Sequence, residues 1–259
     1  KVMEVQKLNY LKDSGRRMLP NVSFHIYEGE ILGIAGVEGN GQTELVEILT
    51  GLRPASSGNA LMEGKPVLNQ TPRQVRQAKV SHIPEDRLTN GLALSASIND
   101  NLIVDRYFKK PFSKGGSLNV KAIKQIGETA IQDFGILTPS GELPVSSLSG
   151  GNMQKVIVAR EFTSEPTLLI ASQPTRGIDV GATEFIREQL VRKRTEGTAV
   201  LLVSADLSEV MSLSDRIIAM FEGEITGVFP DASNVSEEEL GFYMLGVKHQ
   251  SPEEMEAIL

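Results

Sequence analysis

The sequence contains no cysteine and no tryptophan, and aromatic residues make up only 5% of its 259 residues. Without cysteine, neither a disulfide framework nor a cysteine-based metal site is possible. No apolar run approaches the ~20 residues that a membrane-spanning helix needs, and no signal peptide is recognisable. We therefore expect a globular domain, and a partner would have to supply any membrane that its function requires.

The charge balance and the length set further limits. A formal net charge of −7 argues against a nucleic-acid-binding protein that works through overall charge. The 40% apolar and 23% charged residues are ordinary for a globular protein, and 259 residues can bury one large core or two small ones. Because the chain begins with Lys1, we expect it to be a piece of a longer protein.

A glycine-rich stretch, Gly36–Thr43, follows the apolar run Ile31–Ala35 and precedes a helical pattern over residues 44–49. This order of strand, glycine loop and helix is typical of a phosphate-binding loop. The glycines let backbone N–H groups turn towards one point, and the helix N-terminus contributes the positive end of its dipole. Gln42 stands where such loops carry a lysine, so the loop lacks its main side-chain charge.

Apolar strands alternate with helical patterns through the rest of the chain, which predicts an α/β core with a parallel sheet. Residues 2–8 and 22–26 alternate apolar and polar positions, which favours half-buried strands. We also expect a helical subdomain over about residues 90–160 and a helical tail over about residues 235–259. The remaining expected elements are strands at 168–171 and 199–203, helices at 182–194 and 207–213, and a hairpin formed by 216–220 and 224–229.

Two further motifs accompany the loop. The first is Leu148–Lys155, in which a serine and two glycines open a helical run and so predict a second anion site at a helix N-terminus. The second is Ser172–Asp179, which follows the strand expected at 168–171. A glycine loop without lysine is often only a tight turn. The two additional motifs favour a nucleotide-binding function instead.

These motifs, in this order, resemble the nucleotide-binding domain of an ABC transporter ATPase, from about Val2 to Phe229. Ile83–Arg87 and Gln173–Ala182 resemble the second, C-terminal ATPase half of the tandem proteins that power simple-sugar and nucleoside importers. Residues 106–112 and 203–207 favour the nucleoside branch. The resemblance implies a single ABC-type domain over residues 1–259. Its fold class would be an α/β P-loop NTPase with a parallel-sheet core, an antiparallel β edge region and a helical subdomain.

The resemblance also assigns the site residues. It implies that ATP binds at Gly36, Glu38, Gly39, Asn40, Gly41, Gln42, Thr43 and Glu44, with the Thr43 hydroxyl as a candidate ligand for Mg²⁺. The signature motif, which closes over ATP held by a partner domain, would be Leu148, Ser149, Gly150, Gly151 and Asn152. Asp179 matches the aspartate of the inter-domain loop. For adenine stacking Tyr10 is the nearest aromatic, although a strand-edge residue is the simpler interpretation.

Several positions depart from the ATPase pattern. Gln42 replaces the lysine, Ser172 and Gln173 replace the expected Asp–Glu pair, and Ala205 replaces a histidine. None of these four side chains ionises at neutral pH. We therefore expect no catalytic residue in this chain's own site and little or no hydrolysis there, with weak nucleotide binding retained through the loop's backbone.

The function implied is to couple ATP and Mg²⁺ to import of a nucleoside or simple sugar. The expected partners are an N-terminal ATPase half, transmembrane permease subunits and an extracytoplasmic solute-binding protein, with no nucleic acid, at the cytoplasmic face of the membrane. Two alternatives remain open from the sequence. One is an ABC-type ATPase without a transport role, and the other is a nucleotide-sensing module without hydrolysis.

Overall fold

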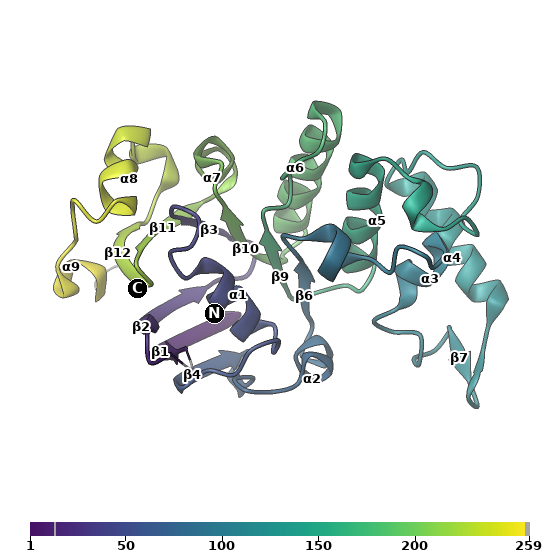
Figure 1. Cartoon of the computed structure of the whole chain (residues 1–259), viewed down its shortest axis with the longest axis horizontal. Helices are drawn as coiled ribbons and strands as arrows, with labels where there is room; N and C mark the ends of the chain where they lie inside the picture. Colours follow the sequence, from purple (N-terminus) through teal and green to yellow (C-terminus); the bar gives the residue numbers. More distant parts are fainter. Residues whose placement is uncertain (13, 257–259) are drawn as a thin grey trace. The chain divides into compact units, whose positions relative to one another are not determined.

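The computed structural model describes residues 1–12 and 14–256 (Figure 1). Its contacts divide the chain into two compact units. The first unit comprises residues 1–82, 166–173 and 190–259, and the second comprises residues 83–165 and 174–189. The last three residues of the expected C-terminal tail lie outside the described residues.

The first unit contains a sheet of six strands in the order β12-β11-β3-β10-β9-β6. Strands β11, β3, β10 and β9 run parallel, and β12 pairs antiparallel with β11. Every residue of β3, β9 and β10 is buried, which is why these strands read as continuous apolar runs in the sequence. The strands are β3 (Ile31–Ala35), β6 (Val80–Ile83), β9 (Leu168–Ser172), β10 (Ala199–Ser204), β11 (Arg216–Phe221) and β12 (Glu224–Phe229).

A second, four-stranded antiparallel sheet has the order β2-β1-β4-β5. Its strands are β1 (Met3–Leu11), β2 (Arg17–Ile26), β4 (Ser57–Met62) and β5 (Lys65–Pro66). The first two are longer than the alternation predicts, because pairing continues towards the turn through Tyr10 with Leu19 and Leu11 with Arg17. The predicted parallel core with an antiparallel edge region is therefore confirmed.

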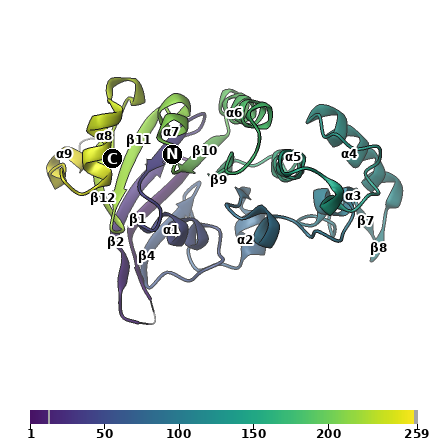
Figure 2. The same cartoon turned by 45° about the horizontal axis from the view of Figure 1, so that its top comes forward.

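Helices cover the six-stranded sheet. Helix α1 (Gln42–Leu49) contacts β9 and also β2 of the smaller sheet, while α7 (Leu207–Leu213) packs on β3 and β10. In Figures 1 and 2, α7 and α1 lie on opposite faces of the large sheet. The other helical segments of this unit are α2 (Pro72–Gln77), η3 (Ala232–Asn234), α8 (Glu237–Met244) and α9 (Pro252–Glu256).

The edge of the large sheet at β12 is covered by the chain's own C-terminal segment. The Gln250 backbone N–H donates to the Thr226 carbonyl at 2.8 Å. Its side-chain amide exchanges two hydrogen bonds with the Val228 backbone, at 2.7 and 3.1 Å. One glutamine thus satisfies edge groups that a further strand would otherwise pair.

A buried ionic cluster fixes the start of β11 to the turn before β3. The Arg216 guanidinium donates to the Glu30 carboxylate at 2.8 Å and to the His25 carbonyl at 2.6 Å. All three residues are more than nine-tenths buried. Burial, assisted by the nearby positive charge of Arg216, lowers the pKa of His25 to about 4, so its imidazole is neutral at physiological pH.

The second unit is mainly helical. It contains α3 (Ile98–Ile103), α4 (Val120–Asp133), α5 (Gly150–Phe162) and the first part of α6 (Val180–Thr195), which ends in the first unit. Helix α3 contacts both α4 and α5. The sequence did not predict three short features of this unit. They are the hairpin of β7 (Ser113–Lys114) and β8 (Ser117–Leu118), the π-helical turn η1 (Arg87–Gly91) and the 3-10 turn η2 (Val145–Ser147). Among the described residues, no helix is long and apolar enough to cross a membrane.

Candidate functional site

The glycine loop in the first unit has the predicted setting between β3 and α1. Gly41 occupies the N-cap of α1 with φ of 98°, and Gly39 has φ of 92°, both in the left-handed region that favours glycine. A Cβ on Gly41 would lie 2.9 Å from the Leu19 side chain and 3.0 Å from the Met18 carbonyl. The loop can therefore present the unpaired N–H groups of the first turn of α1 to an anion.

Gln42 turns its side chain back into this loop. Its amide Nε2 donates to the Val37 carbonyl at 3.2 Å, and the residue is only 7% exposed. A Cβ added to Gly36 would fall 2.2 Å from the same nitrogen, so the amide lies directly against that glycine. The loop therefore has no side-chain charge at this position, as predicted. The sequence does not reveal that the neutral Gln42 amide turns into the loop.

Contacts with other segments of the first unit neutralise a charge of the loop and fix its position. The Glu44 carboxylate pairs with the Lys12 ammonium at 3.0 Å, which offsets a negative charge that would oppose a phosphate in the loop. Asn40 bonds through its side chain to the Glu222 N–H at 3.0 Å and through its carbonyl to the Gly223 N–H at 2.9 Å. The turn between β11 and β12 therefore fastens the loop, while Thr43 remains exposed.

The ends of β9 and β10 bring two of the altered positions together. The side-chain carbonyl of Gln173 accepts a hydrogen bond from the Ala205 backbone N–H at 3.1 Å. Gln173 has φ of 48°, and its own N–H donates to the Val203 carbonyl at 2.7 Å. Ser172 is buried. These positions thus form one neutral, hydrogen-bonded corner.

The donor set at this corner fits Mg²⁺ poorly. Magnesium is usually held through one or two carboxylates, whereas Ser172 and Gln173 offer a hydroxyl and an amide. Among residues 1–12 and 14–256, no group of three or more histidine, aspartate or glutamate side chains could hold a metal ion. The residues of this chain's own site therefore do not fit a bound Mg²⁺ ion.

The second unit contains the other predicted motif, at the start of α5. Ser149 is the N-cap, and its hydroxyl accepts from the Asn152 side-chain amide at 2.9 Å. Asn152 in turn accepts from the Leu137 N–H at 2.9 Å, and Leu148 is buried. The helix therefore starts at a fixed point, with Gly150 and Gly151 adding no side chain to its first turn.

Asp179 lies against this helix N-terminus. It caps α6 by accepting from the Ala182 N–H at 2.9 Å. A Cβ on Gly151 would come within 2.6 Å of the Asp179 carboxylate and 2.9 Å of the Ala182 Cβ, so this contact requires glycine. The structure thus brings together Gly151 and Asp179, which are 28 positions apart in the sequence.

Three residues contribute contacts that sequence reasoning missed. Arg87 donates to the backbone carbonyls of Arg176 and Gly177, at 2.8 and 2.9 Å. The Arg176 guanidinium pairs with the Glu85 carboxylate. Arg87 and Glu85 lie in the segment that resembles the importer ATPases, but that resemblance gave no indication of these partners.

Tyr10, considered for adenine stacking, is 9% exposed in the core of the first unit. Its hydroxyl accepts from Arg53 at 2.5 Å, and the same guanidinium lies over its ring. Little of the ring is open for stacking on a base.

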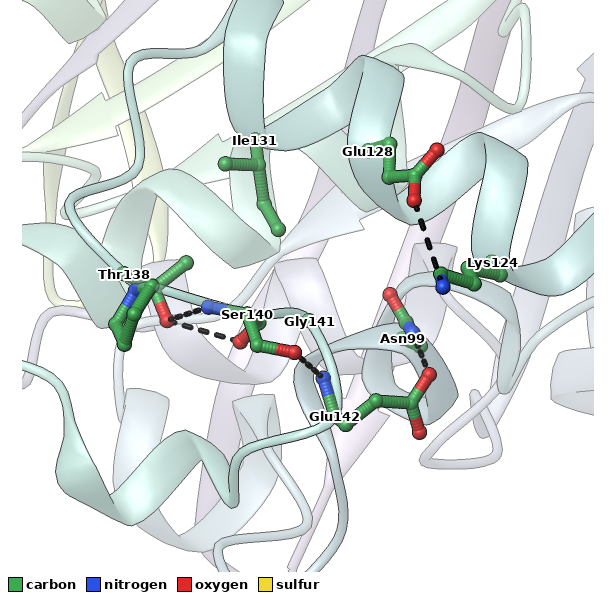
Figure 3. Close-up of a pocket in the computed structure, with 9 residues that line it drawn as sticks. Asn99, Lys124, Glu128, Ile131, Thr138, Ser140, Gly141 and Glu142 are labelled. Carbon is green, nitrogen blue, oxygen red and sulfur yellow. Dashed lines mark hydrogen bonds and ion pairs between the residues drawn. The ribbon is translucent and has the colours of Figure 1, made fainter.

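A cavity of about 340 Å³ lies in the second unit, between α4 and the loop at residues 138–142 (Figure 3). The Asn99 amide donates to the Glu142 carboxylate at 2.9 Å, and Lys124 pairs with Glu128 at 3.9 Å. Among the described residues, the buried Asn99 Oδ1 makes no hydrogen bond, while the other polar groups named here pair with one another.

Three features define a P-loop nucleotide-binding domain. They are the parallel sheet, the glycine loop between β3 and α1, and the Ser149 motif at the N-terminus of α5. The sequence profile of the family described as ABC transporter matches residues 19–176. The chain belongs to the ABC transporter family.

Curated relatives match nearly the whole chain. It is 41% identical over 245 residues to the nucleoside import ATP-binding protein NupA of Lactococcus lactis subsp. cremoris (strain MG1363). It is 42% identical over 245 residues to the guanosine import ATP-binding protein NupO of Bacillus subtilis (strain 168). Each match covers 95% of this chain and 48% of the relative, so the chain spans about half the length of these proteins.

Solved structures share the fold. The dimeric, post-hydrolysis structure of the ATP-binding cassette MJ0796 with ADP and Pi has a TM-score of 0.77 at 19% identity, covering 90% of this chain and 100% of that one. A nucleotide-free ATP-binding cassette from an ABC transporter has a TM-score of 0.75 at 19% identity, covering 100% and 98%. These likenesses confirm the ABC ATPase fold class.

Proposed function

We propose that this chain is the C-terminal ATP-binding half of a tandem importer ATPase for nucleosides or simple sugars. The names of the relatives support nucleosides as the solute, and coverage of about half their length supports a second domain in the same polypeptide. In this proposal residues 1–259 form one ABC-type domain with a helical subdomain at about 90–160. It works at the cytoplasmic face of the membrane with permease subunits and an extracytoplasmic solute-binding protein.

The chain's own site is proposed to be inactive in hydrolysis. Gln42, Ser172, Gln173 and Ala205 leave no general base and no side-chain cation for a γ-phosphate. Removing a general base typically costs about 10²–10⁴ in rate, and removing one preorganised donor about 10²–10³. Such losses do not simply multiply, but together they reduce turnover far below that of a working ABC ATPase. ATP binding through the backbone N–H groups remains, and it is weak.

The signature helix is proposed to act on ATP bound by the N-terminal half. The observation that carries this is the contrast between a neutral site of its own and an intact N-terminus on α5. Ser149 caps that helix, and Gly150 and Gly151 add no side chain to its first turn, where an anion would approach. The partner's loop then holds ATP and Mg²⁺, while this chain supplies the facing donors.

Substitution of Ser149 in the complete transporter tests the proposal. A Ser149→Arg variant places a long side chain at the capped helix N-terminus, so we expect ATP turnover and solute uptake to be lost. Ser117→Arg, at an exposed serine of the β7–β8 hairpin, is the matched control and should retain both. Full turnover by the Ser149→Arg transporter would overturn the proposal.

A further inference from the structure

The π-helical turn η1 occupies a junction in the second unit. Asp86 caps it by accepting from the N–H groups of Leu88 and Thr89, at 2.9 and 3.0 Å. This cap fixes the backbone from which the Arg87 side chain departs. Single π-helical turns of this kind are rare and are found frequently at functional sites.

One end of the turn is fastened to the signature helix α5. The Arg160 guanidinium donates to the Gly91 carbonyl at 2.7 Å and pairs with Glu161 at the same distance, all within the buried interior. A Cβ on Gly91 would lie 2.7 Å from the Ile157 side chain, so the turn packs closely on the helix. The position of η1 is therefore set by α5.

The other end of the turn is fastened to the inter-domain loop. Arg87 places its two terminal nitrogens on two successive carbonyls, those of Arg176 and Gly177, at 2.8 and 2.9 Å. Gly177 has φ of 67°, a conformation that favours glycine. A Cβ on Gly150 would lie only 3.2 Å from Nη2 of Arg87, so the guanidinium also lies beside the first residue of α5.

A planar guanidinium suits this contact, because it holds its donors in a fixed fork that matches two neighbouring acceptors. A lysine retains the charge but presents a single ammonium, so it would satisfy only one carbonyl well. The Arg176–Glu85 ion pair is more exposed and contributes less. The contact of Arg87 with the two carbonyls therefore depends on the shape of its guanidinium.

We propose that Arg87 is a positioning residue for ATP hydrolysis at the partner's site, setting the signature helix and the inter-domain loop in one fixed arrangement. This inference rests on the proposed function of the signature helix. Arg87 acts through the backbone at Arg176–Gly177 and beside Gly150, and it does not touch the nucleotide. Its charge also adds to the positive potential at the N-terminus of α5.

The test measures ATP turnover by the complete transporter with Arg87→Lys and Arg87→Ala. We expect kcat to fall about 10-fold to 100-fold in both, the range for losing a hydrogen bond to a charged group. The KM for ATP should change less than about 3-fold, because the partner's loop holds the nucleotide in the ground state. Arg192→Lys, which changes a half-exposed arginine of α6, should match the unchanged transporter.

Methylguanidinium added to the Arg87→Ala transporter should restore part of kcat, which damage to folding or assembly would not allow. Turnover is expressed per complex that co-purifies with the permease subunits, so reduced assembly cannot imitate the effect. A kcat for Arg87→Lys within about 2-fold of the unchanged transporter would overturn the inference. So would a rise in KM without loss of kcat. If Ser149→Arg abolishes turnover while Arg87→Lys does not, only the role of Arg87 fails, whereas an active Ser149→Arg transporter refutes both.

Discussion

Replacing Gln42 with lysine should restore nucleotide affinity to the chain's own site without restoring hydrolysis. In the structure the Gln42 amide makes one neutral hydrogen bond, to the Val37 carbonyl at 3.2 Å, and it lies against Gly36 inside the loop. A lysine there would add a positive charge beside the N–H groups of α1. The Glu44 carboxylate, which would oppose phosphate, is already paired with Lys12.

The size of the gain follows from the two kinds of hydrogen bond. A neutral bond contributes about 0.5–1.5 kcal/mol and one to a charged group about 1.5–3 kcal/mol, so the difference is about 1.3 kcal/mol. That corresponds to roughly 10-fold tighter ATP binding. Hydrolysis should stay at background, because Ser172, Gln173 and Ala205 are unchanged.

Calorimetric titration of the 259-residue chain with ATP measures the affinity, and release of inorganic phosphate measures hydrolysis. Gln42→Met is the matched control, since it keeps an unbranched side chain of similar length without charge or amide, and it should not bind more tightly. Because the gain is electrostatic, it should also shrink as the salt concentration rises. A Gln42→Lys chain that binds ATP no better than the parent would refute this account of the loop.

Two further predictions concern the buried cluster around Arg216. The folded-state pKa of His25 is about 4, against its ordinary value of 6.5, so the unfolded chain takes up a proton first as pH falls. Stability should therefore decline between about pH 6.5 and 4, by roughly 2.5 kcal/mol from pH 7.5 to 4.5 in urea unfolding, and His25→Gln should lack this component. An equal pH dependence in both proteins would contradict it. Arg216→Met leaves the buried Glu30 carboxylate without its ion-pair partner and should lower the unfolding free energy by about 3–5 kcal/mol. Arg194→Met, which removes an exposed pair, should lower it by no more than about 1 kcal/mol, and similar losses in the two variants would count against the burial argument.

Periodicity predicted the elements whose residues are uniformly buried or regularly spaced. Helix α7 spans the predicted residues 207–213, and β9 and β10 match the predicted apolar runs with small extensions. Short elements with few apolar residues, such as β7 and β8, gave no pattern to recognise. The hydrophobic pattern carries this information because burial fixes which residue types can occupy these positions.

The candidate site was predictable in its motifs and unpredictable in its contacts. The sequence located the glycine loop and Ser149, since both depend on residue types with special backbone roles. It could not show that Gln42 turns inward or that Gln173 bonds to the Ala205 N–H. Backbone carbonyls and N–H groups occur at almost every position, so residue identity does not indicate which one a side chain will meet. For the same reason, the sequence could not show that Arg87 donates to the carbonyls of Arg176 and Gly177.

The cover that Gln250 provides for β12 has a practical consequence. Its three hydrogen bonds to Thr226 and Val228 occupy edge groups that another strand could pair. A chain that ends before Gln250 would lack this cover, and its exposed β12 edge would promote edge-to-edge aggregation. Purification tags and fluorescent fusions on this domain should therefore be attached after Gln250, so that its hydrogen bonds to β12 are kept.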